Sequence, residues 1–131
     1  MSTKICPCGR TEKYEFCCKK KHQDISNAIT AEDLMRSRFV AFTKGMGDYL
    51  MSSHHSTTRP LAQKNEIVNW ANSVKWTHLE ILNKTNGGEG DSEGTVEFKA
   101  HFKEKGKKTF IHENSKFIRE NGVWMYLGFA D

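Results

Sequence analysis

The sequence of 131 residues lacks any run of 18 or more apolar residues, so it predicts no transmembrane helix. Its first residues, Met-Ser-Thr-Lys-Ile-Cys, do not form the apolar segment of a secretory signal. The chain is also too short for a barrel enzyme of roughly 250 residues. We therefore expect a cytoplasmic protein made of one domain, or of one domain with a small appendage.

Several short catalytic motifs are absent as well, including the Walker loop, the dinucleotide-binding fingerprint and H-E-x-x-H. His54, His55 and His112 could act as bases because imidazole titrates near neutral pH. No nucleophile or orienting partner accompanies them in the sequence pattern. We therefore interpret the two loop histidines as exposed polar residues and expect a protein that is not an enzyme.

The whole net charge of +4 lies in the first 22 residues, which hold six basic and two acidic side chains. The remaining residues hold fourteen of each, and all four cysteines also lie in the basic segment. This change in composition predicts a small module in residues 1–22 and a larger domain in residues 28–131. The basic module is either a solvated end or a docking face for an acidic protein or a phosphate backbone.

Cys6, Cys8, Cys17 and Cys18 lie within thirteen residues of one another. Disulfides are disfavoured in a chain without an export signal, and a bridge between adjacent cysteines is strained. Four thiolates about 2.3 Å from one ion form a closed zinc site without an open position for catalysis. We predict a structural zinc ion, with His22 as a reserve ligand, and four free thiols as the alternative.

The pattern Cys-Pro-Cys, eight residues over Gly9–Phe16, and Cys-Cys resembles the SEC-C zinc-binding motif. A similar motif ends the preprotein translocase motor SecA, where it binds an export chaperone and has been linked to the ribosome. The resemblance implies zinc on the four cysteines and a protein partner such as an export chaperone or a ribosomal surface. We expect this partner to contact Lys13, Tyr14, Lys19, Lys20 and Lys21.

The rest of the chain changes from a helical to an alternating pattern after Lys75. Apolar spacing predicts helices over residues 31–44, 48–53 and 63–73. Four strands follow, around residues 79–81, 96–102, 109–119 and 123–129, with the third strand bent or bulged. This order predicts an α+β fold in which a curved, four-stranded antiparallel sheet wraps over the helices.

This second part resembles the YchJ family. The similar segments are residues 31–39, 48–50, 56–60, 96–98, 113–117 and 121–126. The resemblance implies a nuclear-transport-factor-2-like (NTF2-like, or cystatin-like) domain, in which a cone of helices packs against a curved sheet. Together with the SEC-C motif, it implies a fold and a metal, and no reaction.

Arg38 interrupts an apolar helical stripe, where an unpaired guanidinium group would be costly. We expect it to pair with Glu113, or otherwise with Asp48. Such a pair is either a structural link between helix and sheet or the anchor of a pocket for a carboxylate or phosphate. The three tryptophans, Trp70, Trp76 and Trp124, are interpreted as core residues because each lies in a periodic apolar context.

Our leading hypothesis is therefore a cytoplasmic, non-enzymatic zinc protein whose basic module docks on a protein or ribosomal partner. The first alternative is an enzyme or small-ligand binder that uses a cavity near Arg38 and Glu113. The second is nucleic-acid binding by the basic module. With separate modules, Cys8→Ser would unfold only the first 22 residues.

Overall fold

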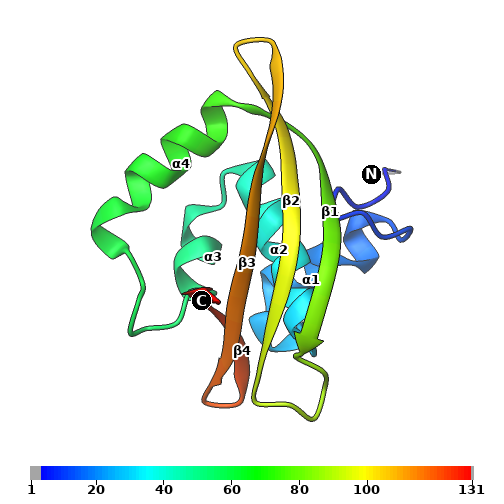
Figure 1. The fold of residues 1–131 in the computed structure, drawn as a ribbon, viewed down its shortest axis with the longest axis vertical. Coiled ribbons are helices and arrows are strands. Elements are labelled where there is room, and N and C mark those ends of the chain that lie inside the picture. The colour runs from blue at the N-terminus through cyan, green and yellow to red at the C-terminus, as the bar shows by residue number, and fades with distance from the viewer. Residues whose placement is uncertain (1–3, 131) are drawn as a thin grey trace.

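In the computed structural model, which describes residues 4–130, a helical half precedes a sheet (Figure 1). The helices are α1 (Cys18–Gln23), α2 (Ala31–Lys44), α3 (Gly47–Ser52) and α4 (Lys64–Ser73), with short 3-10 helices at Tyr14–Phe16, Ile25–Asn27 and Leu61–Gln63. The strands are β1 (Lys75–Asn86), β2 (Glu93–Glu104), β3 (Lys107–Glu120) and β4 (Val123–Phe129). The predicted α+β order of helices and then four strands is confirmed.

Helix α2 is the longest helix of the described chain, and local sequence signals set both of its ends. At the start, the Thr30 hydroxyl accepts a hydrogen bond from the Asp33 amide at 3.0 Å, and two acidic residues lie in the first turn, where the helix dipole favours them. At the end, Gly45 adopts a left-handed φ of 64°, which glycine tolerates without strain. The sequence therefore specifies the position of this helix closely.

The sheet is antiparallel with the strand order β1-β2-β3-β4. Two tight turns connect the last three strands, with Lys105–Gly106 and Asn121–Gly122 at positive φ, as two-residue hairpins require. Strand β3 carries a register shift at Lys116/Phe117, so the predicted irregularity in this strand is confirmed. This shift allows the strand to bend around the helices.

Figure 1 shows α2 behind the sheet, and α3 and α4 beside its β3 strand. The core between the two layers contains fully buried apolar side chains from α2 and from the strands, including Leu34, Phe39, Val40, Phe117 and Trp124. The four cysteines belong to this same buried cluster. Within residues 4–130, no helix is both long enough and apolar enough to cross a membrane.

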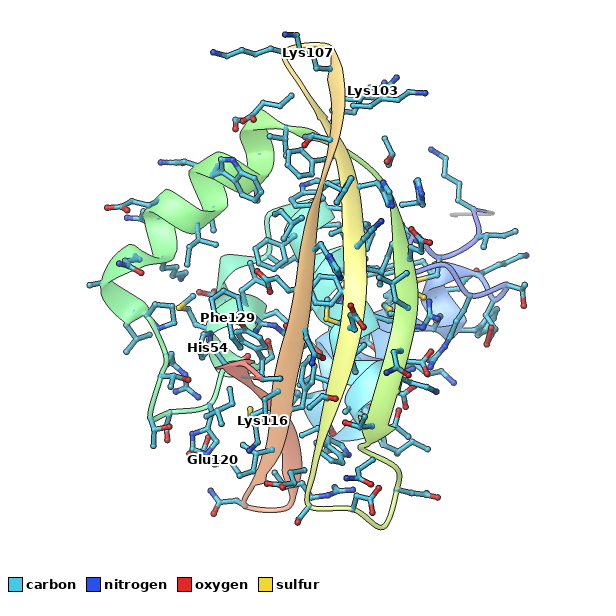
Figure 2. All side chains as sticks on the ribbon, viewed as in Figure 1. His54, Lys103, Lys107, Lys116, Glu120 and Phe129 are labelled. Atoms are coloured by element: carbon cyan, nitrogen blue, oxygen red, sulfur yellow. The ribbon has the colours of Figure 1, made fainter. Side chains whose placement is uncertain are left out.

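The segment after α3 joins the sheet at its β4 edge. Ser53 and His55 exchange backbone hydrogen bonds with Tyr126, at 2.9 Å and 2.8 Å, so that His54 pairs with Tyr126 as an isolated parallel bridge. Figure 2 accordingly shows His54 beside the end of the chain, near Phe129. This connection holds α3 against the sheet and closes one end of the helical layer.

Candidate metal centre and the adjoining cavity

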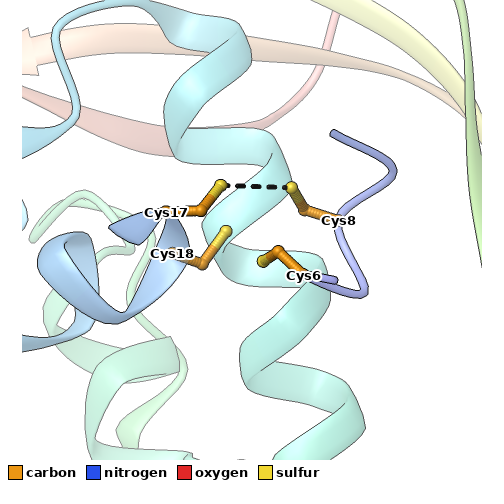
Figure 3. A group of neighbouring side chains, drawn as sticks. All are labelled: Cys6, Cys8, Cys17 and Cys18. Atoms are coloured by element: carbon orange, nitrogen blue, oxygen red, sulfur yellow. Dashed lines mark hydrogen bonds between the residues drawn. The ribbon is translucent and has the colours of Figure 1, made fainter. Parts of the chain in front are cut away.

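The four cysteines meet at one point, and all four are buried (Figure 3). Their Sγ atoms all lie within 4.8 Å of one another, and Cys8 Sγ is 3.6 Å from Cys17 Sγ. None of them forms a disulfide. A tetrahedral site with Zn–S bonds of ~2.3 Å has S–S separations of about 3.8 Å. The group can therefore hold one four-coordinate metal ion with little movement.

Two tight loops bring the sulfur atoms together. In the first loop, the Cys6 amide donates to the Glu12 carbonyl at 2.8 Å, and the Gly9 amide donates to the Cys6 carbonyl at 3.4 Å. Gly9 has a φ of 98°, which a residue with a side chain rarely adopts. In the second loop, the 3-10 turn before Cys17 passes directly into α1, so adjacent cysteines can face one centre.

The loop that carries Cys8 is attached to α2 by charged side chains. Arg36 donates from Nη1 to the Cys8 carbonyl at 2.5 Å and from Nε to Glu32 at 2.8 Å. Arg10, in the same loop, pairs with Asp33 at 2.7 Å. The cysteine segment therefore packs against α2 of the larger domain. The division of the chain into separately folding units, residues 1–22 and 28–131, stays a prediction.

His22 is not part of the sulfur group. Its Nε2–H donates to the Ser37 carbonyl at 2.8 Å, so its Nδ1 accepts from the Tyr14 hydroxyl, also at 2.8 Å. Burial lowers the pKa of His22, which favours this neutral form. The prediction that His22 is a reserve ligand is therefore wrong, because both ring nitrogens are used in holding α1 against α2.

Without a metal ion, the thiols of the cluster differ in how readily each one loses its proton. Hydrogen bonds from Cys18 and Cys8 lower the pKa of the Cys6 thiol. Sharing a proton with Cys6, together with burial, raises the pKa of Cys18. Although the hydrogen bond with Cys18 lowers it, the Cys6 thiol and burial raise the pKa of Cys8 overall. Four thiolates in this buried cluster would require a cation close by, because like charges at this separation repel strongly. A divalent metal ion held by the four sulfur atoms would supply that charge.

The residues expected to meet a partner surround this group. Lys13, Lys19 and Lys20 are exposed, and Lys21 is half-buried. Tyr14 is half-buried beneath the Lys44 ammonium group, which lies 4.3 Å from its ring centroid. These residues therefore occupy the surface of the cysteine segment, but the Tyr14 hydroxyl is already bonded within the protein.

Arg38 and Glu113, the two residues named for a possible pocket, both line a cavity of about 140 Å³. The predicted ion pair of Arg38 is wrong, since no such pair with Glu113 or Asp48 occurs among the described residues. Arg38 Nη1 instead donates to the Leu50 carbonyl at 2.8 Å and to the Ser53 hydroxyl at 2.6 Å. Burial lowers the pKa of Arg38 to about 10, so it remains charged at neutral pH.

Sequence reasoning misplaced three other side chains around this cavity. Trp124 is fully buried, as expected, but Trp70 and Trp76 are half-buried and line the cavity wall. His54, interpreted as an exposed loop residue, is half-buried at the outer part of the cavity. Its neighbour His55, interpreted in the same way, is half-buried as well, away from the cavity and close to Glu120. Helical and alternating periodicity distinguishes inward from outward positions, but it does not distinguish a filled core from a lined cavity.

The position of His54 leads to a test by pH. Burial lowers its pKa from 6.5 to about 4, and the neighbouring charges of Arg38 and Arg59 act in the same direction. As the pH falls from 6.5 to 4, His54 binds a proton in the unfolded chain but stays neutral in the folded protein. The free energy of unfolding therefore decreases over this range. Allowing for solvent screening, we expect His54→Gln to lose about 1.5 kcal/mol less stability than the wild type over this range in urea titrations.

The exposed His112, which bonds to Glu97 at 2.7 Å, provides the matched control. His112→Gln should follow the wild-type decline between pH 6.5 and 4. If His54→Gln also declines in parallel with the wild type, His54 is not buried as a neutral ring.

Residues 90–94 read Gly-Asp-Ser-Glu-Gly and so match the spacing G-x-S-x-G. In hydrolases this spacing forms a strained turn between a strand and a helix. Here the segment is part of the turn that leads into β2, and Ser92 is exposed. The match therefore does not form a nucleophile site.

Comparison with known proteins agrees with this architecture. A family model described as the middle NTF2-like domain of YchJ matches residues 30–128. The UPF0225 protein of Streptomyces coelicolor is 40% identical over 126 residues, which cover 96% of this chain and 94% of the relative. The UPF0225 protein of Chromobacterium violaceum is 43% identical over 122 residues, which cover 93% and 89%.

Two solved structures share the fold over nearly the whole chain. The solution structure of a SEC-C motif containing protein from Rhodopseudomonas palustris aligns with a TM-score of 0.84 and 30% identity, covering 95% of each chain. The crystal structure of a SEC-C motif containing protein from Psychrobacter arcticus aligns with a TM-score of 0.81 and 30% identity, covering 96% of this chain and 81% of the other.

Proposed function

Because this chain belongs to the YchJ family, we propose that its four cysteines hold one structural zinc ion and that the surface around them docks on an acidic protein partner in the cytoplasm. The observation that carries the proposal is the meeting of four buried sulfur atoms within 4.8 Å, without a disulfide. Two of the similar solved structures are described as SEC-C motif containing proteins, which agrees with a zinc-binding role.

Zinc suits this donor set better than other divalent ions. Four thiolates are soft ligands, and zinc takes them in closed tetrahedral sites, whereas calcium and magnesium require oxygen ligands. With all four positions occupied by cysteine, the ion has no open site for water or substrate. The metal therefore acts structurally, and the protein is proposed not to use it for catalysis.

The proposed docking surface is a shallow hollow of about 430 Å³ beside the cysteine loops. Its lining combines apolar side chains with lysines: Lys4, Ile5, Pro7, Tyr14, Glu15, Lys19 and Lys44. Ile5 is 61% exposed, so it offers apolar surface beside the lysines. An apolar side chain in the hollow and acidic groups around it would complement this surface.

Zinc would make this surface effective by holding both loops in place before the partner arrives. A rigid surface loses less conformational entropy on binding than a mobile one. Removal of zinc should therefore weaken docking even where no lysine is changed. The motif suggests an export chaperone or a ribosomal protein as the partner. Either one would need an acidic surface to bind the lysines beside the cysteines.

The test is affinity capture from a nuclease-treated native extract, followed by binding measurements with the partner so identified. Lys19→Glu/Lys20→Glu reverses two exposed charges, one that lines the hollow and one next to it in the chain, and should weaken binding about tenfold or more. The matched control is Lys105→Glu/Lys107→Glu, which makes the same charge change at the β2–β3 hairpin tip (Figure 2). Binding that survives both charge reversal at Lys19 and Lys20 and zinc chelation would defeat the docking proposal.

Nucleic-acid binding by the basic segment is the competing function, and the same variants distinguish it. Binding to RNA or DNA would fall steeply with salt and would be lost after nuclease treatment. Because the hairpin-tip lysines are also basic, a nucleic acid would be sensitive to both double variants. A protein partner should respond only to the variant beside the cysteines.

A further inference from the structure

A second site, independent of the cysteines, lies between α2 and the sheet. Its inner part is a cavity of about 140 Å³, and a hollow of about 510 Å³ adjoins it toward α3 and α4. The two spaces share six lining residues: Arg38, Phe42, Trp70, Ile111, Glu113 and Tyr126. They therefore form one continuous cleft, of the size that small-molecule sites usually have.

The most informative group in this cleft is the Arg38 side chain, which is only 6% exposed. Its Nη1 donates hydrogen bonds to the Leu50 carbonyl and the Ser53 hydroxyl. Its guanidinium carbon lies 4.7 Å from the Tyr126 ring centroid. Nε and Nη2 have no hydrogen-bond partner in the described structure. Since no buried side-chain nitrogen or oxygen of the described residues is left unsatisfied, these two donors keep some accessible surface, and Arg38 lines both parts of the cleft.

The walls around these donors are apolar and mostly aromatic. Trp70 and Trp76 meet edge to face with ring centroids 5.5 Å apart, and Phe98 and Ile111 contribute further apolar surface to the inner cavity. Aromatic walls of this kind accept a flat apolar group. A buried cation at one point of such a cleft selects a ligand with an anionic end.

Glu113 limits the charge of that ligand. It lines both parts of the cleft, and Arg38 is the single cationic group among the described residues that line the shared space. A dianion such as a phosphate ester would bring two negative charges beside one arginine and one carboxyl group. A carboxylate brings one charge, and its two oxygens match two neighbouring guanidinium donors.

We propose that this cleft binds a small, flat, apolar molecule that carries one carboxylate, with the carboxylate on Nε and Nη2 of Arg38 and the apolar body against Trp70 and Trp76. The cleft lies on the side of α2 that faces the sheet, whereas the cysteine loops contact α2 through Arg36. The cleft therefore adds a ligand site to the docking function proposed above, and either can fail without the other.

The experiment titrates the zinc-loaded, full-length protein with 2-naphthoate and with its neutral amide, 2-naphthamide, and monitors the tryptophan side-chain N–H signals by NMR. We expect 2-naphthoate to shift the signals of Trp70 and Trp76 and to leave that of the fully buried Trp124 unchanged. The dissociation constant should be about 1 mM or lower. The amide should bind about tenfold more weakly, because it cannot form charged hydrogen bonds with Arg38.

Two variants make the assignment specific. Glu113→Gln keeps the shape of the side chain but removes its negative charge, so it should tighten 2-naphthoate binding several-fold and change amide binding little. Arg38→Lys keeps the charge but loses the two adjacent donors, and it should weaken 2-naphthoate about tenfold. The amide oxygen of Glu113→Gln can still accept from the buried Ser115 hydroxyl, which bonds to Glu113 at 3.3 Å, so this variant keeps the test valid even if Arg38→Lys does not fold.

The proposal is overturned if 2-naphthoate and 2-naphthamide bind equally well, or if Glu113→Gln weakens the carboxylate. It is equally overturned if neither the wild type nor Glu113→Gln responds to millimolar 2-naphthoate.

Discussion

Cys8→Ser is expected to lose the metal ion and to lower the melting temperature of the whole chain by about 15 °C. An ion that binds only the folded state, at a free concentration 1,000 times its dissociation constant, contributes about 4 kcal/mol to stability. For a domain of this size, each kcal/mol corresponds to about 4 °C. The loss should extend to the sheet, because the cysteines share one buried cluster with Leu34 and Val40 of α2.

Calorimetry on the zinc-loaded wild type and on Cys8→Ser measures this effect. Chelation should lower the melting temperature of the wild type to that of the variant, whereas the variant should not respond to chelator. A variant that shows a second, unshifted transition for the larger domain would contradict the account. It would mean that the first 22 residues fold separately, as the composition alone suggested.

Trp124→Ala is expected to destabilise the protein by about 4 kcal/mol, as large buried aromatic side chains do when truncated. The side chain is fully buried between β4 and α2. Its Nε1–H donates to the Ile29 carbonyl at 3.2 Å, directly before α2, and the Arg119 guanidinium carbon lies 4.5 Å from its ring centroid. Truncation therefore removes packing and also releases the segment that leads into α2.

Urea titration measures the loss of stability in Trp124→Ala. Two further variants show how much of it comes from the hydrogen bond and how much from the buried position. Trp124→Phe keeps most of the apolar volume but loses the hydrogen bond, so about 2 kcal/mol is expected. Trp70→Ala removes a half-buried cavity wall and should cost less than Trp124→Ala. If Trp124→Ala costs under about 1 kcal/mol, Trp124 is not a central core residue.

Most of the fold follows from local sequence signals. The cap at Thr30 and the glycine at Gly45 define α2, and the tight turns at Lys105–Gly106 and Asn121–Gly122 define the last two hairpins. Each signal acts through the backbone conformation of a few adjacent residues, so it can be recognised without knowledge of the tertiary structure. The cysteine spacing is similarly local, which explains why the metal ligands could be predicted as a group.

The errors concern contacts between segments distant in sequence. The polar partners of Arg38 are a carbonyl and a hydroxyl near the end of α3, and neither is recognisable from residue type, because every residue has a carbonyl. One of the contacts that attach the cysteine loops to α2 is likewise a backbone acceptor, the Cys8 carbonyl, which accepts from Arg36. Such contacts are fixed by the packing of whole elements, and periodicity reports only which face of each element turns inward.

The most direct test of the central claim is the metal content of the protein, purified without oxidation and without added metal. Inductively coupled plasma mass spectrometry, combined with native mass spectrometry, should find one zinc ion per chain in the wild type and none in Cys8→Ser. A fully reduced wild-type protein that carries no metal, and that takes up none when zinc is supplied, would contradict the account.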